Sequence, residues 1–383
     1  MKRAFVLVID ACGAGELPDA AAYGDTGSNT LGHLATVVGG LRLPVLERLG
    51  LGSILPIEGV KPSPTPAIHG RLHASGPGKD STAGHWELMG VVAPQALPTY
   101  PNGFPSSVIR VITDAARGRA VICNAPFNGL AVIDEFGAEH LRTGDLIVYT
   151  SQDSVLQIAA HEQVVSTVEL HAICTEVRAR LPPEHAVGRV IARPFKGVAG
   201  AFERTGARQD LALAPPTHSY MDSLQRKGVP VHTVGKAGQL FSGQGIDQQH
   251  PGSTNAIALR ETETLIDRLS RGLVFTNLIE TDQVYGHRHD AEGFHGALRE
   301  IDAHVGRWLP RLGEDDLLII TADHGVDVTA RHTDHTREHA PLIAFSPGLP
   351  GFRHDGTMSD VGATALHWLA GSEDDELPGM PFV

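Results

Sequence analysis

Three apolar, β-branched runs in this chain each end close to an aspartate. The aspartates are Asp10, Asp282 and Asp323, which follow the runs 5–9, 273–279 and 317–320. Runs of this kind are typical of buried parallel strands, and ligands in open α/β folds bind beyond the carboxyl ends of such strands. We therefore expect the three carboxylates to meet at one edge of a sheet.

Short apolar runs alternate with helical stretches along most of the chain, which is typical of an α/β protein with a largely parallel sheet between helices. We expect strands at 4–9, 145–150, 188–192, 229–234, 273–279, 317–321 and 341–345. We expect helices at 106–117, 166–181, 255–270, 292–309 and 359–370. The last of these helices should have its cap at Ser359 and end at Gly371.

Two proline-containing segments, 93–105 and 214–218, interrupt this alternation. A chain of 383 residues also exceeds one ordinary single-core domain. We therefore expect a discontinuous core formed by 1–97 and 217–383, with an inserted α/β cap at 98–216.

Histidines accompany the acids at the expected sheet edge. His287 follows Asp282, His324 is next to Asp323, and His335 comes twelve positions after Asp323. Aspartate and histidine are usual ligands for pairs of divalent ions in phosphoryl-transfer enzymes, and this mixture suits Mn²⁺, Zn²⁺ or Mg²⁺. The alternative is that Asp10 and Asp323 cap helices and that the histidines are surface or core residues.

A possible nucleophile lies in the segment 76–87, where glycines and small residues surround the hydroxyls of Ser81 and Thr82. Metal coordination can lower the pKa of a hydroxyl and make it a nucleophile. The alternative is an ordinary loop that ends in a Ser or Thr helix cap. The Gly13 and Gly15 pair lacks the third glycine of a dinucleotide-binding fingerprint, so we reject that interpretation.

Several polar residues in and near the expected cap could bind a phosphorylated sugar. Ser151 and Asp153 follow a strand and could bind sugar hydroxyls. Arg193 and Arg208 could bind a phosphate through paired hydrogen bonds, and Lys236 follows a core strand. The alternative for each cation is a solvated surface charge.

Net charge and composition exclude some classes of partner. The formal net charge of −13 argues against nucleic acid or an anionic membrane as the main partner. No apolar run approaches the roughly 18 residues that span a bilayer. The first apolar run ends at Asp10 without a small-residue cleavage site, so we interpret it as a strand and not a signal peptide. Three cysteines without a CxxC pair suit a reducing cytoplasm. The sequence does not specify the oligomeric state.

Seven segments, in order along the chain, closely resemble the phosphopentomutase family of the alkaline phosphatase superfamily. They are 8–10, 27–33, 79–87, 149–154, 285–288, 321–325 and 333–338. The Asp-His-Gly element at 323–325 indicates only the superfamily, whereas 79–87 and 334–338 are far more specific. The resemblance implies an alkaline-phosphatase-like core with an inserted cap.

The resemblance also implies a set of site residues. One Mn²⁺ would be bound by Asp10, Asp323 and His324, and a second by Asp282, His287 and His335. The family's phosphorylated threonine falls at Ser81, with Thr82 as the second candidate. The positions that match sugar-phosphate contacts are Ser151, Asp153, Arg193, Arg208 and Lys236.

The activity that the resemblance implies is the interconversion of ribose 1-phosphate and ribose 5-phosphate, and of the 2-deoxyribose pair. The reaction would pass through a phosphoenzyme and a sugar bisphosphate, which would also act as activator. The alternatives are a metal-dependent phosphatase or another phosphomutase of the superfamily, and a sugar-phosphate-binding protein without catalysis.

Overall fold

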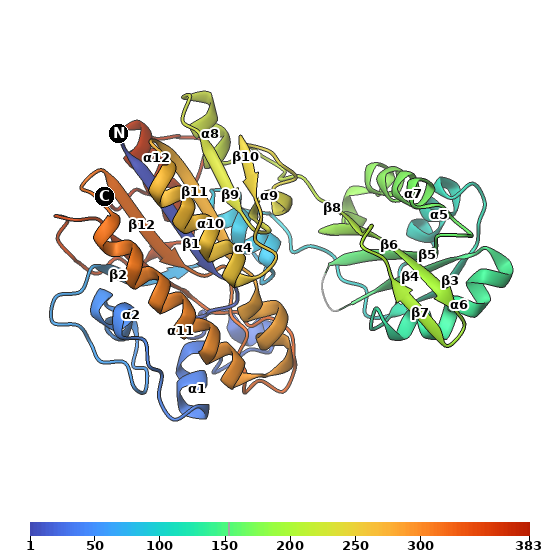
Figure 1. Ribbon diagram of the computed structural model, residues 1–383, viewed down its shortest axis with the longest axis horizontal. Coiled ribbons are helices and arrows are strands. Elements are labelled where there is room, and N and C mark those ends of the chain that lie inside the picture. The colour runs from blue at the N-terminus through green and yellow to red at the C-terminus, as the bar shows by residue number, and fades with distance from the viewer. Residues whose placement is uncertain (152–153) are drawn as a thin grey trace. The chain divides into compact units, whose positions relative to one another are not determined.

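The computed structural model describes residues 1–151 and 154–383, which form two compact units (Figure 1). Unit 1 comprises Met1–Ala96 and Pro215–Val383, and unit 2 comprises Leu97–Ala214. Each unit has its own sheet with helices around it, so the expected α/β class with a largely parallel sheet is confirmed.

The sheet of unit 1 has eight strands in the order β10-β9-β11-β1-β12-β13-β2-β14. Their bounds are β10 Gln248–His250, β9 Val231–Val234, β11 Gly272–Leu278, β1 Arg3–Ile9, β12 Asp316–Thr321, β13 Ala340–Phe345, β2 Ile68–His73 and β14 Gly356–Thr357. All neighbouring pairs are parallel except β12 with β13 and β13 with β2.

Strand β1 lies between β11 and β12 and pairs in parallel with both. Apart from the partly exposed Arg3, every residue of these three strands is buried, which explains why their sequences are mostly apolar. At the start of β1, Arg3 donates two hydrogen bonds of 2.6 Å to Asp316 at the start of β12. The three strands are thus held in register, and their carboxyl ends meet.

The helices of unit 1 connect these strands, and α10, α11 and α12 lie along the sheet (Figure 1). Their bounds are α1 Thr30–Val37, α2 Pro44–Leu49, α3 Leu51–Ile54, α4 Ser81–Leu88, α8 Tyr220–Arg226, α9 Ala237–Leu240, α10 Asn255–Arg268, α11 Ala291–Trp308 and α12 Asp360–Ala370. Helix α12 begins after Ser359 and ends at Gly371, as expected, but the Ser359 hydroxyl donates to the Glu87 carbonyl and does not cap the helix.

Unit 2 has a six-stranded sheet in the order β3-β4-β5-β6-β7, with β8 paired to β6. Its elements are β3 Val121–Pro126, β4 Leu146–Thr150, β5 Val155–His161, β6 Arg189–Val198, β7 Ala201–Arg204, β8 Gln209–Ala212, α5 Ser106–Ala115, α6 Ala131–Thr143 and α7 Thr167–Arg180. Two clusters of buried apolar side chains form its core.

All seven expected strands are present, as β1, β4, β6, β9, β11, β12 and β13, and all five expected helices, as α5, α7, α10, α11 and α12. The segment 93–105 contains no helix or strand, as its prolines predict. The sequence did not predict the remaining elements, which include helix α6 and the fully buried strand β5 as well as shorter or more polar ones. Strand β2, for example, has His69, Gly70 and Arg71 at its centre, and it forms because its backbone pairs with β13.

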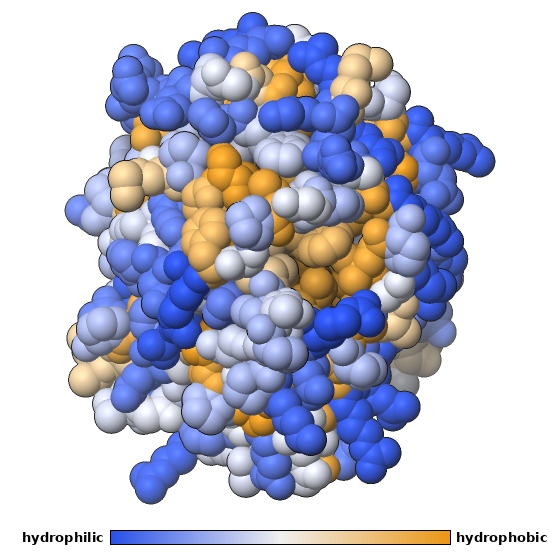
Figure 2. Space-filling model, turned by 90° about the vertical axis from the view of Figure 1, so that its left-hand side faces the viewer, coloured by the Kyte–Doolittle hydropathy of each residue, from blue (hydrophilic) through white to orange (hydrophobic). Residues whose placement is uncertain are grey.

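Hydrophilic residues cover much of the face shown in Figure 2, and they surround apolar patches. Within the described residues, no helix is both long enough and apolar enough to cross a bilayer.

Candidate functional site

The three predicted acids follow the carboxyl ends of adjacent strands. Asp10 directly follows β1, Asp323 comes two residues after β12, and Asp282 lies in a π-helical turn, Thr281–Tyr285, after β11. All three are buried. The helix-cap alternative is wrong for Asp10 and Asp323, because neither residue caps a helix among those described.

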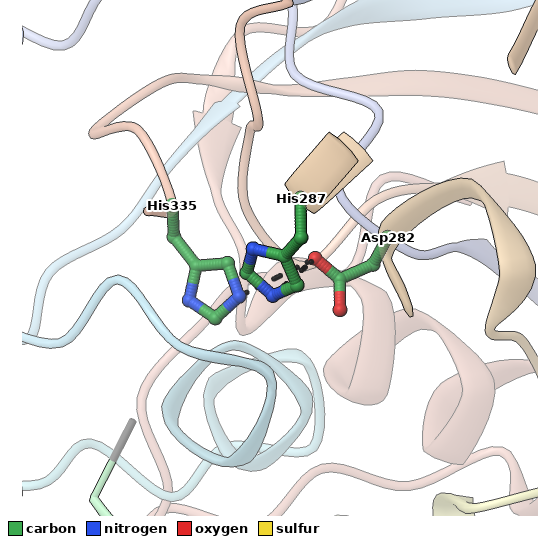
Figure 3. A group of neighbouring side chains, drawn as sticks. All are labelled: Asp282, His287 and His335. Atoms are coloured by element: carbon green, nitrogen blue, oxygen red, sulfur yellow. Dashed lines mark ion pairs between the residues drawn. The ribbon is translucent and has the colours of Figure 1, made fainter. Parts of the chain in front are cut away.

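Two groups of side chains at this edge have their ligand atoms within 4.8 Å of one another. The first group is Asp282, His287 and His335, in which the Asp282 carboxylate is 3.4 Å and 3.3 Å from the two imidazoles (Figure 3). The second group is Asp10, Asp282 and His324, with 3.4 Å between Asp10 Oδ1 and His324 Nε2. Asp282 belongs to both groups, so the two candidate sites are contiguous.

Asp323 lies beside the second group. Its Oδ2 is 3.4 Å from His324 Nε2, while its Oδ1 accepts hydrogen bonds from the backbone N–H groups of Ala11 and His324. All six side chains that the sequence indicated as ligands therefore lie in one cluster within unit 1.

Backbone pairing in the loop after β12 places the last histidine. Gly325 and Thr336 exchange two backbone hydrogen bonds, which brings His335 next to His324 with 4.0 Å between ring centroids. The buried Glu338 carboxylate supports this loop by accepting hydrogen bonds from Thr30 and Thr336.

Hydrogen bonds outside the cluster orient two of the imidazoles. His287 Nδ1 lies 2.6 Å from the Thr333 carbonyl oxygen, and His324 Nδ1 lies 3.2 Å from that of Gly325. Because a carbonyl only accepts, each Nδ1 bears a proton, and Nε2 is the nitrogen that faces the carboxylates. This is the usual arrangement of metal-binding histidines.

The electrostatics of the cluster suit a cation. Burial alone would raise the pKa of Asp10, but the His324 imidazole lowers it well below its usual range. Burial and the charge of Asp10 raise the pKa of Asp323. Asp282 Oδ1 and Asp323 Oδ2 are buried, and among the described residues they face imidazole nitrogens at 3.1 to 3.4 Å without a well-aligned hydrogen bond. Carboxylate and imidazole donors crowded in this way fit divalent metal ions.

Helix α4 brings a hydroxyl to this cluster. Asp80 is its N-cap and accepts hydrogen bonds from the backbone N–H groups of the second and third helical residues, so the alternative of a Ser or Thr cap is wrong. Ser81, the first helical residue, has its Oγ 3.1 Å from His324 Nε2 and 3.3 Å from Asp10 Oδ1. Thr82 follows it and is buried.

Two buried residues that the sequence did not indicate contact the candidate ligands. Asn277 Nδ2 donates a 2.9 Å hydrogen bond to Asp10 Oδ2. His85 Nδ1 is 3.1 Å from Asp323 Oδ2. A signal for Asn277 was present, because an amide within a fully buried strand needs a polar partner.

Lys236 is in unit 1, and its Nζ donates a 2.9 Å hydrogen bond to Gln283, the residue after Asp282. Its charge contributes to the lowered pKa of Asp10. Ser151, Arg193 and Arg208 are in unit 2, and Asp153 lies outside the described residues.

Unit 2 contains a cluster of cations near Tyr149. Arg193 lies on β6, and burial, together with the charges of Arg208 and Arg204, lowers its pKa to about 10. The Nε of Arg193 is buried and has no hydrogen-bond partner among the described residues. Arg208 is next to β8 and forms two hydrogen bonds of 2.5 Å with Asp210. A bound anion would offset the repulsion among these arginines.

Comparisons with known proteins cover nearly the whole chain. The model of the Metalloenzyme superfamily matches residues 2–372. The phosphopentomutase of Anaeromyxobacter sp. (strain K) is 46% identical over 376 residues, which is 97% of each chain. The phosphopentomutase of Carboxydothermus hydrogenoformans is 47% identical over 368 residues, which is 95% of each chain. The solved PH0037 protein from Pyrococcus horikoshii has a TM-score of 0.50 at 13% identity, over 97% of this chain and 98% of that one, and is similar in fold.

Proposed function

The chain belongs to the phosphopentomutase family of the Metalloenzyme superfamily, and on this premise we propose how it acts on pentose phosphates. As an isomerase of this family, it would interconvert ribose 1-phosphate and ribose 5-phosphate, and the corresponding 2-deoxyribose phosphates. The observation that most supports the proposal is the position of Ser81 Oγ, 3.1 Å from His324 Nε2 at the edge of the acid and histidine cluster.

We propose two Mn²⁺ ions as the resident metals. Asp10, Asp323 and His324 would bind one ion, and Asp282, His287 and His335 the other. When bound, two such ions stabilise the attacking and leaving oxygens of an in-line phosphoryl transfer. The buried, mutually repelling carboxylates support this assignment, because cations would offset their repulsion.

Ser81 would hold a phosphoryl group on its Oγ. The free hydroxyl of the bound pentose monophosphate would attack this phosphorus, so one P–O bond forms to the sugar as the bond to Ser81 Oγ breaks. The proton that the sugar hydroxyl loses is balanced by the proton that Ser81 Oγ gains. The resulting bisphosphate would then reorient in the site, and its other phosphate would be transferred to Ser81. A trace of sugar bisphosphate would therefore prime the enzyme. The start of α4 suits this role, because the amino end of a helix favours negative charge.

Unit 2 would act as the cap that binds the sugar phosphate, and it would exclude water that could hydrolyse the phosphoenzyme. Arg193 and Arg208 would bind the phosphate that is not being transferred, while Ser151 and Asp153 would bind sugar hydroxyls. Lys236 of unit 1 would contribute a further cation. The buried Nε of Arg193, which has no hydrogen-bond partner in the part of the chain that the structure describes, supports this assignment. We propose the cytoplasm as the compartment.

A pair of neighbouring substitutions tests the nucleophile. Ser81→Ala should lower the isomerisation of ribose 5-phosphate by at least about a thousandfold, because no oxygen remains to accept the phosphoryl group. Thr82→Ala is the matched control, and it should keep most of the activity. After incubation with ribose 1,5-bisphosphate, intact-mass spectrometry should detect one added phosphoryl group in the wild type and Thr82→Ala, and none in Ser81→Ala. The opposite pattern would assign the role to Thr82.

The same assay separates the alternative functions. Formation of the isomer with little inorganic phosphate supports a mutase, whereas net phosphate release would indicate a phosphatase. Absence of any exchange of labelled phosphate in the presence of Mn²⁺ would indicate a sugar-phosphate-binding protein without catalysis.

A further inference from the structure

Helix α4 presents one face to the proposed metal ligands. Ser81, Gly84 and His85 are at positions i, i+3 and i+4, which lie on the same side of an α-helix. Ser81 contacts Asp10 and His324 through its hydroxyl. Gly84 and His85 both lie against Asp323.

Gly84 allows the helix backbone to approach the strand end closely. A Cβ at this position would lie 2.3 Å from the Asp323 carbonyl oxygen and 2.8 Å from the Asp323 Cβ, so no other residue fits without a shift of the backbone. Helix α4 and the segment after β12 therefore touch directly. Any movement of one must displace the other, because both are buried here.

His85 links the same two segments through its side chain. The residue is fully buried, and its ring packs at 5.7 Å from that of Phe275. Its Nδ1 lies 2.8 Å from the Ser81 carbonyl oxygen and 3.1 Å from Asp323 Oδ2. The carbonyl only accepts a hydrogen bond, so Nδ1 bears a proton, and this proton also attracts the carboxylate oxygen.

The two oxygens of Asp323 are thus held by different groups. Backbone N–H groups of Ala11 and His324 donate to Oδ1, each at 3.1 Å. Oδ2 faces His85 Nδ1 at 3.1 Å and His324 Nε2 at 3.4 Å. Without His85, Oδ2 would lose this contact with helix α4.

We propose that His85 is a positioning residue that orients Asp323 Oδ2 for metal binding and fixes it relative to Ser81. This inference rests on the proposed function, because it takes Asp323 as a metal ligand and Ser81 as the nucleophile. Groups that support ligands in this way typically change metal affinity by about 10–100-fold when they are replaced. The alternative is that His85 only fills space in the core.

Two amide substitutions distinguish positioning from packing. The side-chain nitrogen of Asn can occupy the place of His Nδ1, whereas that of Gln reaches the place of Nε2. His85→Asn should therefore keep the contact with Asp323, and His85→Gln should lose it. If His85 only fills space, the Asn variant should be impaired more than the Gln variant, since Asn leaves the larger cavity and is the poorer helix former.

The experiment measures Mn²⁺ affinity by equilibrium dialysis and the melting temperature in EDTA, on the full-length wild type and both variants. We expect His85→Gln to weaken Mn²⁺ binding by about 10–100-fold and His85→Asn by less than about threefold, although Asn lowers the melting temperature more. Equal affinities in all three proteins, or weaker binding in Asn than in Gln, would overturn the inference. If His85→Asn does not fold, unchanged affinity in folded His85→Gln would also overturn it.

Asp323→Asn separates this inference from the proposed function. A loss of Mn²⁺ affinity in Asp323→Asn, with none in His85→Gln, would leave the metal assignment intact and overturn only the role of His85. Unchanged affinity in Asp323→Asn would overturn the metal assignment itself, and the inference about His85 with it.

Discussion

At the scale of single residues, the amide of Asn277 shows how the fold orients a proposed ligand. Asn277 is fully buried on β11, and its Nδ2 donates a 2.9 Å hydrogen bond to Asp10 Oδ2. Asp10 Oδ1 thereby remains directed towards His324 Nε2 and Ser81 Oγ. The amide thus selects which carboxylate oxygen faces the cluster.

Asn277→Leu should weaken Mn²⁺ binding by about tenfold or more, because Asp10 loses the donor that fixes its orientation. Thr276→Val is the matched control. Successive strand residues point to opposite faces, and Thr276 forms its hydrogen bond with Thr262 of α10. This control should lower the melting temperature without changing Mn²⁺ affinity in equilibrium dialysis. Equal losses of affinity in the two variants would contradict the role of Asn277.

At the scale of elements, the strands and helices that the sequence predicted are those with strong apolar patterns. Strands β1, β11 and β12 are buried on both faces, so nearly every position is apolar. Helix α4 was not predicted as a helix. It has only eight residues, including Gly84, and its polar Ser81 and His85 face the candidate site. Polar residues that face the candidate site occupy positions of α4 where apolar residues would have formed the pattern that predicts a helix.

Helix α6 and strand β5 of unit 2 are joined through the buried His140. Its Nδ1 donates to the Asp145 carbonyl, and its Nε2 accepts a 2.8 Å hydrogen bond from the backbone N–H of His161. This arrangement requires a neutral ring, and burial lowers the pKa of His140. A neutral buried histidine stabilises the fold above its unfolded pKa of about 6.5, and this stabilisation is lost as the pH falls towards the lower folded pKa.

Amide exchange of His161 should therefore accelerate, after correction for the intrinsic rate, as the pH falls from about 7 to 5. His140→Gln is the control, because its amide oxygen can accept the same hydrogen bond and does not titrate. Hydrogen exchange measured by mass spectrometry or NMR on both proteins gives the comparison. The same pH dependence in His140→Gln would show that another group is responsible.

At the scale of the whole molecule, the proposed metal ligands and the proposed phosphate-binding arginines belong to different units. The six proposed metal ligands and Ser81 all lie in unit 1, although Asp10 and His335 are more than 300 positions apart in the sequence. The described arginines that we propose for phosphate binding lie in unit 2. The chemistry of metal binding and the recognition of the sugar phosphate should therefore be separable.

Replacement of residues 98–213 by a flexible Gly/Ser linker of about ten residues tests this separation. The shortened protein should still bind Mn²⁺, since every proposed ligand remains, but it should not isomerise ribose 5-phosphate. Full-length Arg193→Ala is the control, and it should raise the KM for ribose 5-phosphate while Mn²⁺ affinity is unchanged. A folded core that no longer binds Mn²⁺ would show that unit 2 contributes to the metal site.

The sequence alone determined the α/β class, five of the eight strands in the sheet of unit 1 and the residues that could bind metals. Apolar runs report burial directly, and an aspartate at the end of such a run has few other roles. The tertiary structure decided which atoms meet. The pairing of β1 with both β11 and β12 brings the three acids to one edge, and only the packing of α4 against Asp323 revealed His85. These contacts join residues far apart in the chain, so no local pattern could specify them.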